Sequence, residues 1–286
     1  MTTEPFGTRL AAAMAHYGQL CVGIDPHAGL LAHWGLADDA GGLRTFALRV
    51  IEALAGQVAA VKPQAAFFER HGSAGIVVLE EVIAAARAAG LLCILDAKRG
   101  DIGTTMDGYA QAYLSDRSPL APDALTLSPY LGFGALQPAL RTAADNDRGV
   151  FVLALTSNPD GRGIQHARDA NGVAVAATVA QAAARHNAAE LADGAPMGSV
   201  GLVVGATVGD APSQLGLDLP ALGGPILAPG IGAQGAGGAD LVRTFGAGLP
   251  AVLATSSRAV LQAGPRAGDL VRAAGALTAE LRAITA

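Results

Sequence analysis

Eight short apolar runs recur along the chain, and nearly every one ends in a polar residue or a glycine. Runs of this length are typical of buried strands. The segments between them carry apolar residues at helical spacing instead. The pattern predicts strands over residues 20–25, 58–63, 91–95, 124–129, 150–158, 200–207, 225–232 and 251–255. It predicts helices over residues 8–17, 43–55, 74–89, 105–114, 133–144, 173–191, 213–222, 239–245 and 269–284, with a surface loop at 159–168.

Strands and helices alternate throughout, with short connections. Such alternation gives a parallel sheet covered by helices, and eight units close a (β/α)8 barrel. An open doubly wound sheet is the alternative. The barrel is favoured because no strand-to-helix turn carries G-x-G-x-x-G and no break in composition marks a second domain. The sequence therefore predicts the α/β class, with one TIM (β/α)8 barrel domain over residues 1–286 and a short leading helix.

Composition narrows the classes of function. The apolar fraction is 51%, which builds a large core, and the net charge is -5 without any basic block, which argues against a nucleic-acid partner. No signal peptide is evident, and no apolar stretch is long enough to predict a membrane span. Cys21 and Cys93 lie inside apolar runs, as small core residues of a reducing compartment do. We expect a soluble, cytoplasmic protein with no membrane partner.

Candidate chemistry collects at the strand ends, where barrel enzymes hold their active sites. Lys62 directly follows an apolar run, and a lysine there is unusual unless it is paired. Asp96 and Lys98 follow the third run two residues apart, so strand alternation points both to one face. The glycine-rich segment 229–235 and Arg258 follow the last two strands, where barrels commonly bind phosphate. The other polar strand ends are Asp25, Ser128, Asn158 and Thr207.

Each candidate also has a purely structural interpretation. Asp25 precedes a proline and suits a turn, the Lys62 ammonium can extend to solvent, and Arg258 can begin a surface helix. Asp96 and Lys98 can form an ordinary salt-bridged turn. These interpretations are much less probable jointly than singly. The six histidines show no paired metal-ligand spacing, so we expect no metal site. Neither a G-x-S-x-G nor an H-E-x-x-H motif is present, which disfavours serine and zinc hydrolases.

Residues 96–105 read Asp-Ala-Lys-Arg-Gly-Asp-Ile-Gly-Thr-Thr. This segment resembles the Asp-x-Lys-x-x-Asp-Ile-x-x-Thr signature of orotidine 5'-phosphate decarboxylase, in the form found in the longer bacterial branch of that family. Val61-Lys62-Pro63, Ser128-Pro-Tyr-Leu-Gly132, Thr156-Ser-Asn-Pro159 and Pro229-Gly-Ile-Gly-Ala-Gln-Gly235 also match in order. The resemblance covers residues 25–258, which is nearly the whole chain.

The resemblance implies decarboxylation of orotidine 5'-monophosphate (OMP) to UMP in pyrimidine biosynthesis, without a metal or an organic cofactor. It implies a homodimer whose active sites are shared at the interface. Lys62, Asp96 and Lys98 would form the charged array of one subunit, with Lys98 as proton donor to C6, and Asp101 would come from the partner. The implied substrate contacts are Asp25 and the partner's Thr105 at the ribose, Ser128 at the pyrimidine, and Gln234 and Arg258 at the phosphate. Ile102 and Asn158 complete the expected substrate-binding set.

Two alternatives stay open. Sugar-phosphate enzymes on related barrels, such as 3-keto-gulonate-6-phosphate decarboxylase or hexulose-phosphate synthase, share the Asp-x-Lys-x-x-Asp core but use Mg²⁺. The second alternative is a non-catalytic barrel that keeps only the phosphate site. The intact set of Lys62, Asp96, Lys98 and Asp101 argues against the second. The segments 159–168 and 192–199 have no clear counterpart in the shorter branch of the family.

Overall fold

The computed structural model describes residues 4–232 and 237–285, and the strands among them form one closed barrel. All neighbouring strands are parallel and follow one another in chain order, and β8 closes the ring against β1. The strands are β1 (Leu20–Ile24), β2 (Ala60–Pro63), β3 (Leu92–Arg99), β4 (Ala124–Leu127), β5 (Gly149–Leu155), β6 (Val200–Val204), β7 (Ile226–Pro229) and β8 (Val252–Ser256). The predicted TIM barrel is therefore confirmed.

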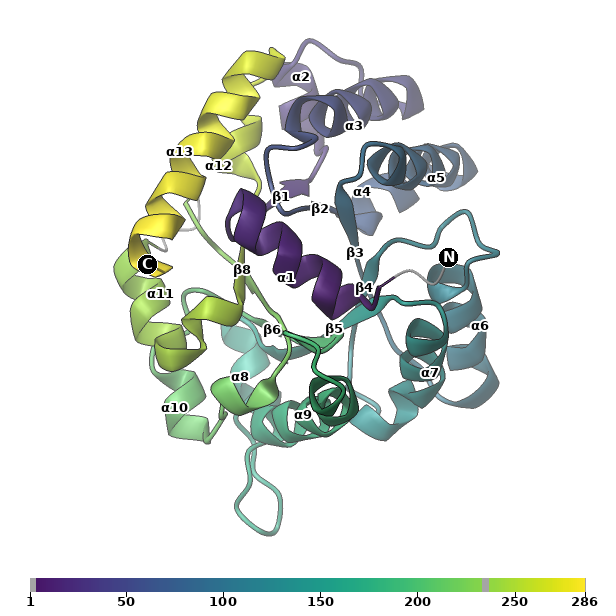
Figure 1. Ribbon diagram of the computed structural model, residues 1–286. Coiled ribbons are helices and arrows are strands. Elements are labelled where there is room, and N and C mark those ends of the chain that lie inside the picture. The colour runs from purple at the N-terminus through teal and green to yellow at the C-terminus, as the bar shows by residue number, and fades with distance from the viewer. Residues whose placement is uncertain (1–3, 233–236, 286) are drawn as a thin grey trace.

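Helices surround this barrel (Figure 1). The longer ones are α1 (Phe6–Tyr17), α3 (Ala40–Leu54), α5 (Gly72–Ala88), α6 (Gly103–Leu114), α7 (Gln137–Asp145), α9 (Val175–Ala192), α11 (Gly238–Phe245) and α13 (Ala267–Thr285). Short helices α2 (Ala28–His33), α4 (Ala65–Glu69), α8 (Arg162–Gln165), α10 (Ala211–Leu215) and α12 (Arg258–Leu261) lie in the connections. No helix of the described residues has the length and apolar character that crossing a membrane requires.

Several element boundaries differ from the predicted ones. The third strand continues past Leu95 to Arg99, whereas the fifth and sixth strands end three residues earlier than predicted. The helix predicted over residues 213–222 is wrong. It is a short helix that ends at Gly216, whose φ of 75° is left-handed, followed by a separate 3-10 turn (Pro220–Leu222). A left-handed residue cannot continue a right-handed helix, so the two turns form independently.

The leading helix α1 covers the amino-terminal opening of the barrel. Figure 1 shows it lying across the ring of strands. Phe6 of α1 is fully buried and meets Phe151 of β5 edge to face, with ring centroids 6.0 Å apart. A side chain at Gly149 would overlap the Phe6 ring, so this close approach needs glycine. With this end covered, the carboxyl ends of the strands are left as the open face.

Candidate active site

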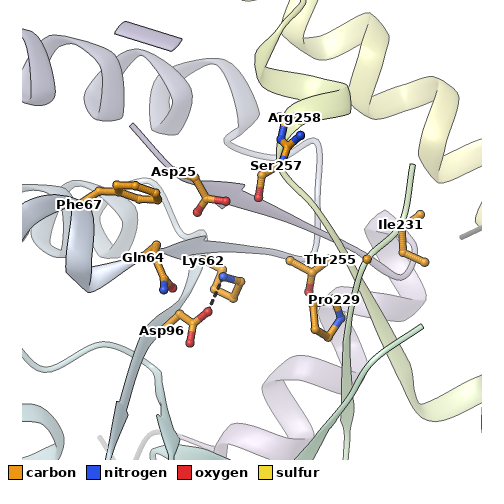
Figure 2. Close-up of a pocket in the computed structure, with 11 residues that line it drawn as sticks. Asp25, Lys62, Gln64, Phe67, Asp96, Pro229, Ile231, Thr255, Ser257 and Arg258 are labelled. Atoms are coloured by element: carbon orange, nitrogen blue, oxygen red, sulfur yellow. Dashed lines mark hydrogen bonds and ion pairs between the residues drawn. The ribbon is translucent and has the colours of Figure 1, made fainter. Parts of the chain in front are cut away.

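A cavity of about 260 Å3 lies at the carboxyl ends of the strands (Figure 2). It lies at the end of the barrel where the strand-end pattern predicted a site, because its walls come from β2, β3, β7 and β8, from the segments that follow β1, β2, β7 and β8, and from α4. Figure 2 shows carboxylate, ammonium, amide and hydroxyl groups around this space. The lining residues are Asp25, Lys62, Gln64, Phe67, Asp96, Pro229, Gly230, Ile231, Thr255, Ser257 and Arg258.

Asp96 lies between two lysine side chains and forms an ion pair with each of them. Its Oδ2 lies 2.8 Å from Lys62 Nζ and its Oδ1 lies 2.6 Å from Lys98 Nζ. The Lys62 and Asp96 side chains are only 7% and 12% exposed, whereas the Lys98 side chain is 44% exposed. The charges of Lys62 and Asp96 are therefore buried, whereas solvent or a ligand can reach the ammonium group of Lys98.

The charges of Lys62, Asp96 and Lys98 stabilise one another. Burial alone would raise the pKa of Asp96, but the adjacent Lys62 and Lys98 ammonium groups outweigh it and hold that pKa well below its ordinary value. Burial alone would lower the pKa of Lys62, but Asp96 and Asp25 raise it above its ordinary value. Asp96 is therefore ionised and Lys62 protonated at neutral pH.

The backbone of β3 is irregular where it carries these residues. The pairing of β3 with β4 shifts between Leu95 and Arg99, and Lys98 has a φ of 48°. Simple strand alternation was therefore the wrong reason for expecting Asp96 and Lys98 on one face. They meet because the extra residues form a bulge that turns Lys98 back toward Asp96.

Two residues that line the cavity, Asp25 and Thr255, each have a buried side-chain oxygen without a hydrogen-bond partner among the described residues, Asp25 Oδ1 and Thr255 Oγ1. Buried polar atoms are nearly always hydrogen-bonded, so an unpaired one in a cavity-lining residue is a candidate contact for a ligand. Asp25 was predicted from its strand end. The sequence did not predict Thr255 as a site residue, because Arg258 was the residue expected to bind the ligand at the end of β8.

Another part of the cavity wall is formed by the segments that follow β7 and β8. Ser256 Oγ donates to the carbonyl of Ile231 at 3.1 Å and so joins the two segments. Arg258 is exposed and lines the cavity beside Gly230. Gln234, predicted to bind phosphate, lies outside the described residues.

The residues that follow β3 lie outside the cavity. Asp101 Oδ1 accepts a hydrogen bond from the backbone N–H of Ile102 at 2.8 Å, and no ion pair joins Asp101 to another described residue. Ile102 is 59% exposed, and Thr105 is exposed one turn later in α6. Tyr130 and Leu131, which follow the neighbouring strand β4, are 74% and 53% exposed. An apolar surface therefore adjoins the carboxyl end of β3.

Ser128 and Asn158 follow β4 and β5 but do not line the cavity. The Ser128 N–H donates to Arg99 O at 2.8 Å, and Asn158 Oδ1 accepts from Thr156 Oγ1 at 2.6 Å. Thr207 lies in a second cavity of about 300 Å3, between the ends of β5 and β6.

Sequence reasoning missed two further residues that contact Asp96. With its amide nitrogen toward Asp96, Gln64 donates to Asp96 Oδ2 at 2.7 Å and to Asp96 O at 3.1 Å. Thr126 Oγ1 of β4 donates to Asp96 Oδ1 at 2.9 Å. The only signal for Thr126 is a threonine within the apolar run 124–127, and Gln64 gives none because it follows Pro63 in a connection.

Among the described residues, no group of three or more His, Cys, Asp or Glu side chains is arranged to hold a metal ion.

Comparison with known proteins gives consistent results over nearly the full chain. The model of the family described as "Orotidine 5'-phosphate decarboxylase / HUMPS family" matches residues 18–273. Orotidine 5'-phosphate decarboxylase of Salinispora arenicola is 56% identical over 280 residues, covering 98% of both chains. The enzyme of the same name from Streptomyces coelicolor is 55% identical over 285 residues, covering 99% of both chains. A crystal structure assigned as orotidine 5'-phosphate decarboxylase of Streptomyces avermitilis superimposes with a TM-score of 0.94 at 55% identity, covering 100% of this chain and 97% of that one.

Proposed function

This chain belongs to the orotidine 5'-phosphate decarboxylase / HUMPS family, and from that premise we propose that it converts OMP to UMP and CO2. It is a carboxy-lyase of pyrimidine biosynthesis. The observation that carries the proposal is the ion-paired set of Lys62, Asp96 and Lys98, in which Lys62 and Asp96 line the cavity at the carboxyl end of the barrel and Lys98 pairs with Asp96 beside it.

The chemistry follows from where negative charge develops. When the bond between C6 and the carboxylate breaks, CO2 leaves and the electron pair stays on C6. A proton from Lys98 Nζ then forms the new C–H bond, and water reprotonates the amine. Lys98 is suited to this role because its ammonium is partly exposed and held 2.6 Å from Asp96 Oδ1. A fixed positive charge placed where negative charge develops is usually the largest catalytic contribution.

Asp96 and Lys62 keep that ammonium in place. A buried carboxylate between two ammonium groups needs no proton and cannot move without breaking both ion pairs. We propose that the role of Asp96 and Lys62 is to hold the Lys98 ammonium oriented toward the substrate. Lys62 and Asp25, which both line the cavity, are proposed to bind the ribose hydroxyls of OMP. The proposal is supported by Asp25 Oδ1, which has no hydrogen-bond partner among the described residues.

Arg258 and the backbone that follows β7 are proposed to bind the phosphate. A guanidinium presents paired donors that match phosphate oxygens, and the glycine-rich backbone supplies N–H groups. Gln234 is proposed as a further phosphate ligand on the motif alone. Ser128 and Asn158 remain proposed substrate contacts, and because both lie outside the cavity, they would need the surrounding loops to close over the ligand.

A homodimer is the proposed working form. Asp101, Ile102 and Thr105 would serve the neighbouring subunit's site, with Asp101 completing its charged array. The support is the position of Asp101 outside its own cavity and the exposed apolar side chains of Ile102, Tyr130 and Leu131 beside it, since exposed apolar patches mark interaction surfaces. A cytoplasmic location is part of the proposal, because Cys21 and Cys93 are both free and buried.

The alternative within the same family is a magnesium-dependent enzyme acting on a sugar phosphate. The family description covers more than one kind of enzyme, but the relatives at 55–56% identity bear the name of the decarboxylase. A non-catalytic barrel is less consistent with the intact, mutually paired charges of Lys62, Asp96 and Lys98.

The test is to incubate the purified protein with OMP in EDTA and to follow formation of UMP by absorbance and chromatography. We expect turnover that is unchanged by EDTA. No UMP in EDTA together with turnover of a hexulose phosphate on adding Mg²⁺ would support the alternative, and no turnover of either substrate would contradict an enzymatic role.

A further inference from the structure

The irregular pairing of β3 with β4 leaves one residue of β4 opposite several of β3. Leu95 pairs with Leu125 and Arg99 pairs with Leu127, so residues 96–98 all face Thr126. A bulge of this kind leaves backbone N–H groups without a partner in the strand ladder. Buried N–H groups need another acceptor.

The Thr126 hydroxyl supplies that acceptor. Thr126 is completely buried, and its Oγ1 accepts from the N–H of Ala97 at 3.0 Å and from the N–H of Lys98 at 2.9 Å. The same hydroxyl donates to Asp96 Oδ1 at 2.9 Å. A hydroxyl has one donor and two acceptor positions, and here all three are used within one bulge.

Thr126 holds Lys98, and the backbone conformation of Lys98 is strained. Lys98 has a φ of 48°, in the left-handed region that side chains other than glycine, asparagine and aspartate rarely adopt. Such conformations persist only where the surroundings fix them, and they cluster at functional sites. The hydrogen bond from the Lys98 N–H to Thr126 fixes the backbone, and the ion pair with Asp96 fixes the side chain.

We propose that Thr126 is a positioning residue for the decarboxylation, an inference that rests on the proposed function. It holds the backbone of Lys98 and the carboxylate of Asp96 at the same time, so one hydroxyl sets the geometry of the proton donor relative to its counter-ion. Thr126 is completely buried and its hydroxyl is fully used within the bulge, so it acts through these two residues and not on the substrate.

A purely structural threonine would behave differently. Loss of its hydroxyl would reduce the amount of folded protein but leave each folded molecule as active as before. Loss of a positioning hydroxyl lowers kcat in the folded enzyme and leaves KM nearly unchanged. The residues proposed to hold the ribose and the phosphate, Asp25, Lys62 and Arg258, have no hydrogen bond to Thr126, and Lys62 pairs with the other oxygen of Asp96.

The experiment compares Thr126→Val, which keeps the shape and removes the hydroxyl, with Thr126→Ser, which keeps the hydroxyl. Thr244→Val is the matched control, because Thr244 is another buried threonine whose hydroxyl donates to a backbone carbonyl, that of Ala206 at 3.3 Å. We expect kcat of folded Thr126→Val to fall about 100-fold with KM changed less than about threefold, since a small misplacement of a catalytic group costs about this much. Thr126→Ser and Thr244→Val should keep kcat within about threefold of wild type, because neither loses the hydroxyl that holds the bulge.

Equal kcat in folded Thr126→Val and Thr244→Val overturns the inference, and so does a Thr126→Ser enzyme as slow as Thr126→Val. If Thr126→Val does not fold, Thr126→Cys replaces it, since a thiol is a weak donor and acceptor of similar size. A folded Thr126→Cys enzyme with wild-type kcat then overturns the inference. Absence of OMP turnover by the wild type would instead refute the proposed function, so the two failures are distinct.

Discussion

Asp96 is the residue on which the arrangement of the site depends, because each of its two carboxylate oxygens faces a lysine. Removing one partner of a buried charge pair leaves the other uncompensated, which costs about 3–5 kcal/mol. Substituting Lys62, Asp96 or Lys98 is therefore expected to lower both the stability of the protein and its catalytic rate. Arg258 is a better position for a substitution test, because it is exposed and forms no ion pair with Lys62, Asp96 or Lys98.

We expect Arg258→Ala to lower kcat/KM for OMP about 100-fold, which is the effect of losing a charge-assisted contact to phosphate. It should leave kcat/KM for orotidine, the same nucleoside without phosphate, unchanged. Arg266→Ala is the control, since Arg266 is an exposed arginine outside the cavity whose partner is Asp269. Steady-state kinetics on both substrates checks this, and an equal loss on OMP and orotidine would assign Arg258 another role.

Among individual residues, the sequence predicted site residues where a charged residue follows an apolar run. Lys62 after an apolar run and the closely spaced Asp96 and Lys98 were predicted site residues, and the structure brings them within hydrogen-bond distance. Thr126 was not predicted, because its role depends on a shift in pairing between two strands that no single strand encodes.

At the scale of elements, β3 and α1 serve opposite ends of the barrel. β3 carries Asp96 and Lys98 at the open end, whereas α1 fills the other end with Phe6, Leu10 and Met14. Barrel enzymes keep catalysis at the carboxyl face and stability at the amino face. Changes to α1 should therefore alter stability without altering the chemistry.

Phe6→Ala tests this division. The ring is completely buried against Phe151, so we expect the free energy of unfolding to fall by about 3–5 kcal/mol. Under conditions where the protein stays folded, kcat should be that of the wild type. Val242→Ala, at an exposed apolar position of α11, should change stability by less than about 0.5 kcal/mol. Denaturant unfolding and kinetics on the same preparations check both values, and a kcat loss in folded Phe6→Ala would contradict the separation of the two ends.

Strand and helix positions could largely be predicted, because apolar runs and helical spacing follow from burial. The short helices α2, α4, α8 and α12 were missed, since four to six residues are too few for a periodic pattern. The end of β3 could not be placed either, because its last residues are charged and owe their strand pairing to β4.

At the scale of the whole molecule, the closed barrel explains how residues from distant parts of the chain form one site. Parallel strands in chain order bring Asp25, Lys62, Asp96 and Arg258 to the same face. The fold followed from counting alternating elements. The proposed dimer could not be reached in this way, because the residues assigned to it are recognised only by family resemblance and by an apolar surface that the single chain leaves exposed.

We propose that β3 supplies Lys98 to its own active site for OMP decarboxylation and that the residues after β3 supply Asp101 to the partner's site. Mixing inactive Lys98→Ala and Asp101→Ala subunits tests it most directly, with heterodimers confirmed by two different affinity tags. Each heterodimer would contain one intact site and one site that lacks both groups. A random equal mixture should therefore recover roughly one quarter of the wild-type rate of UMP formation, as two-fold symmetry requires. Confirmed heterodimers that form no UMP would show that the active site is not shared between subunits in this way.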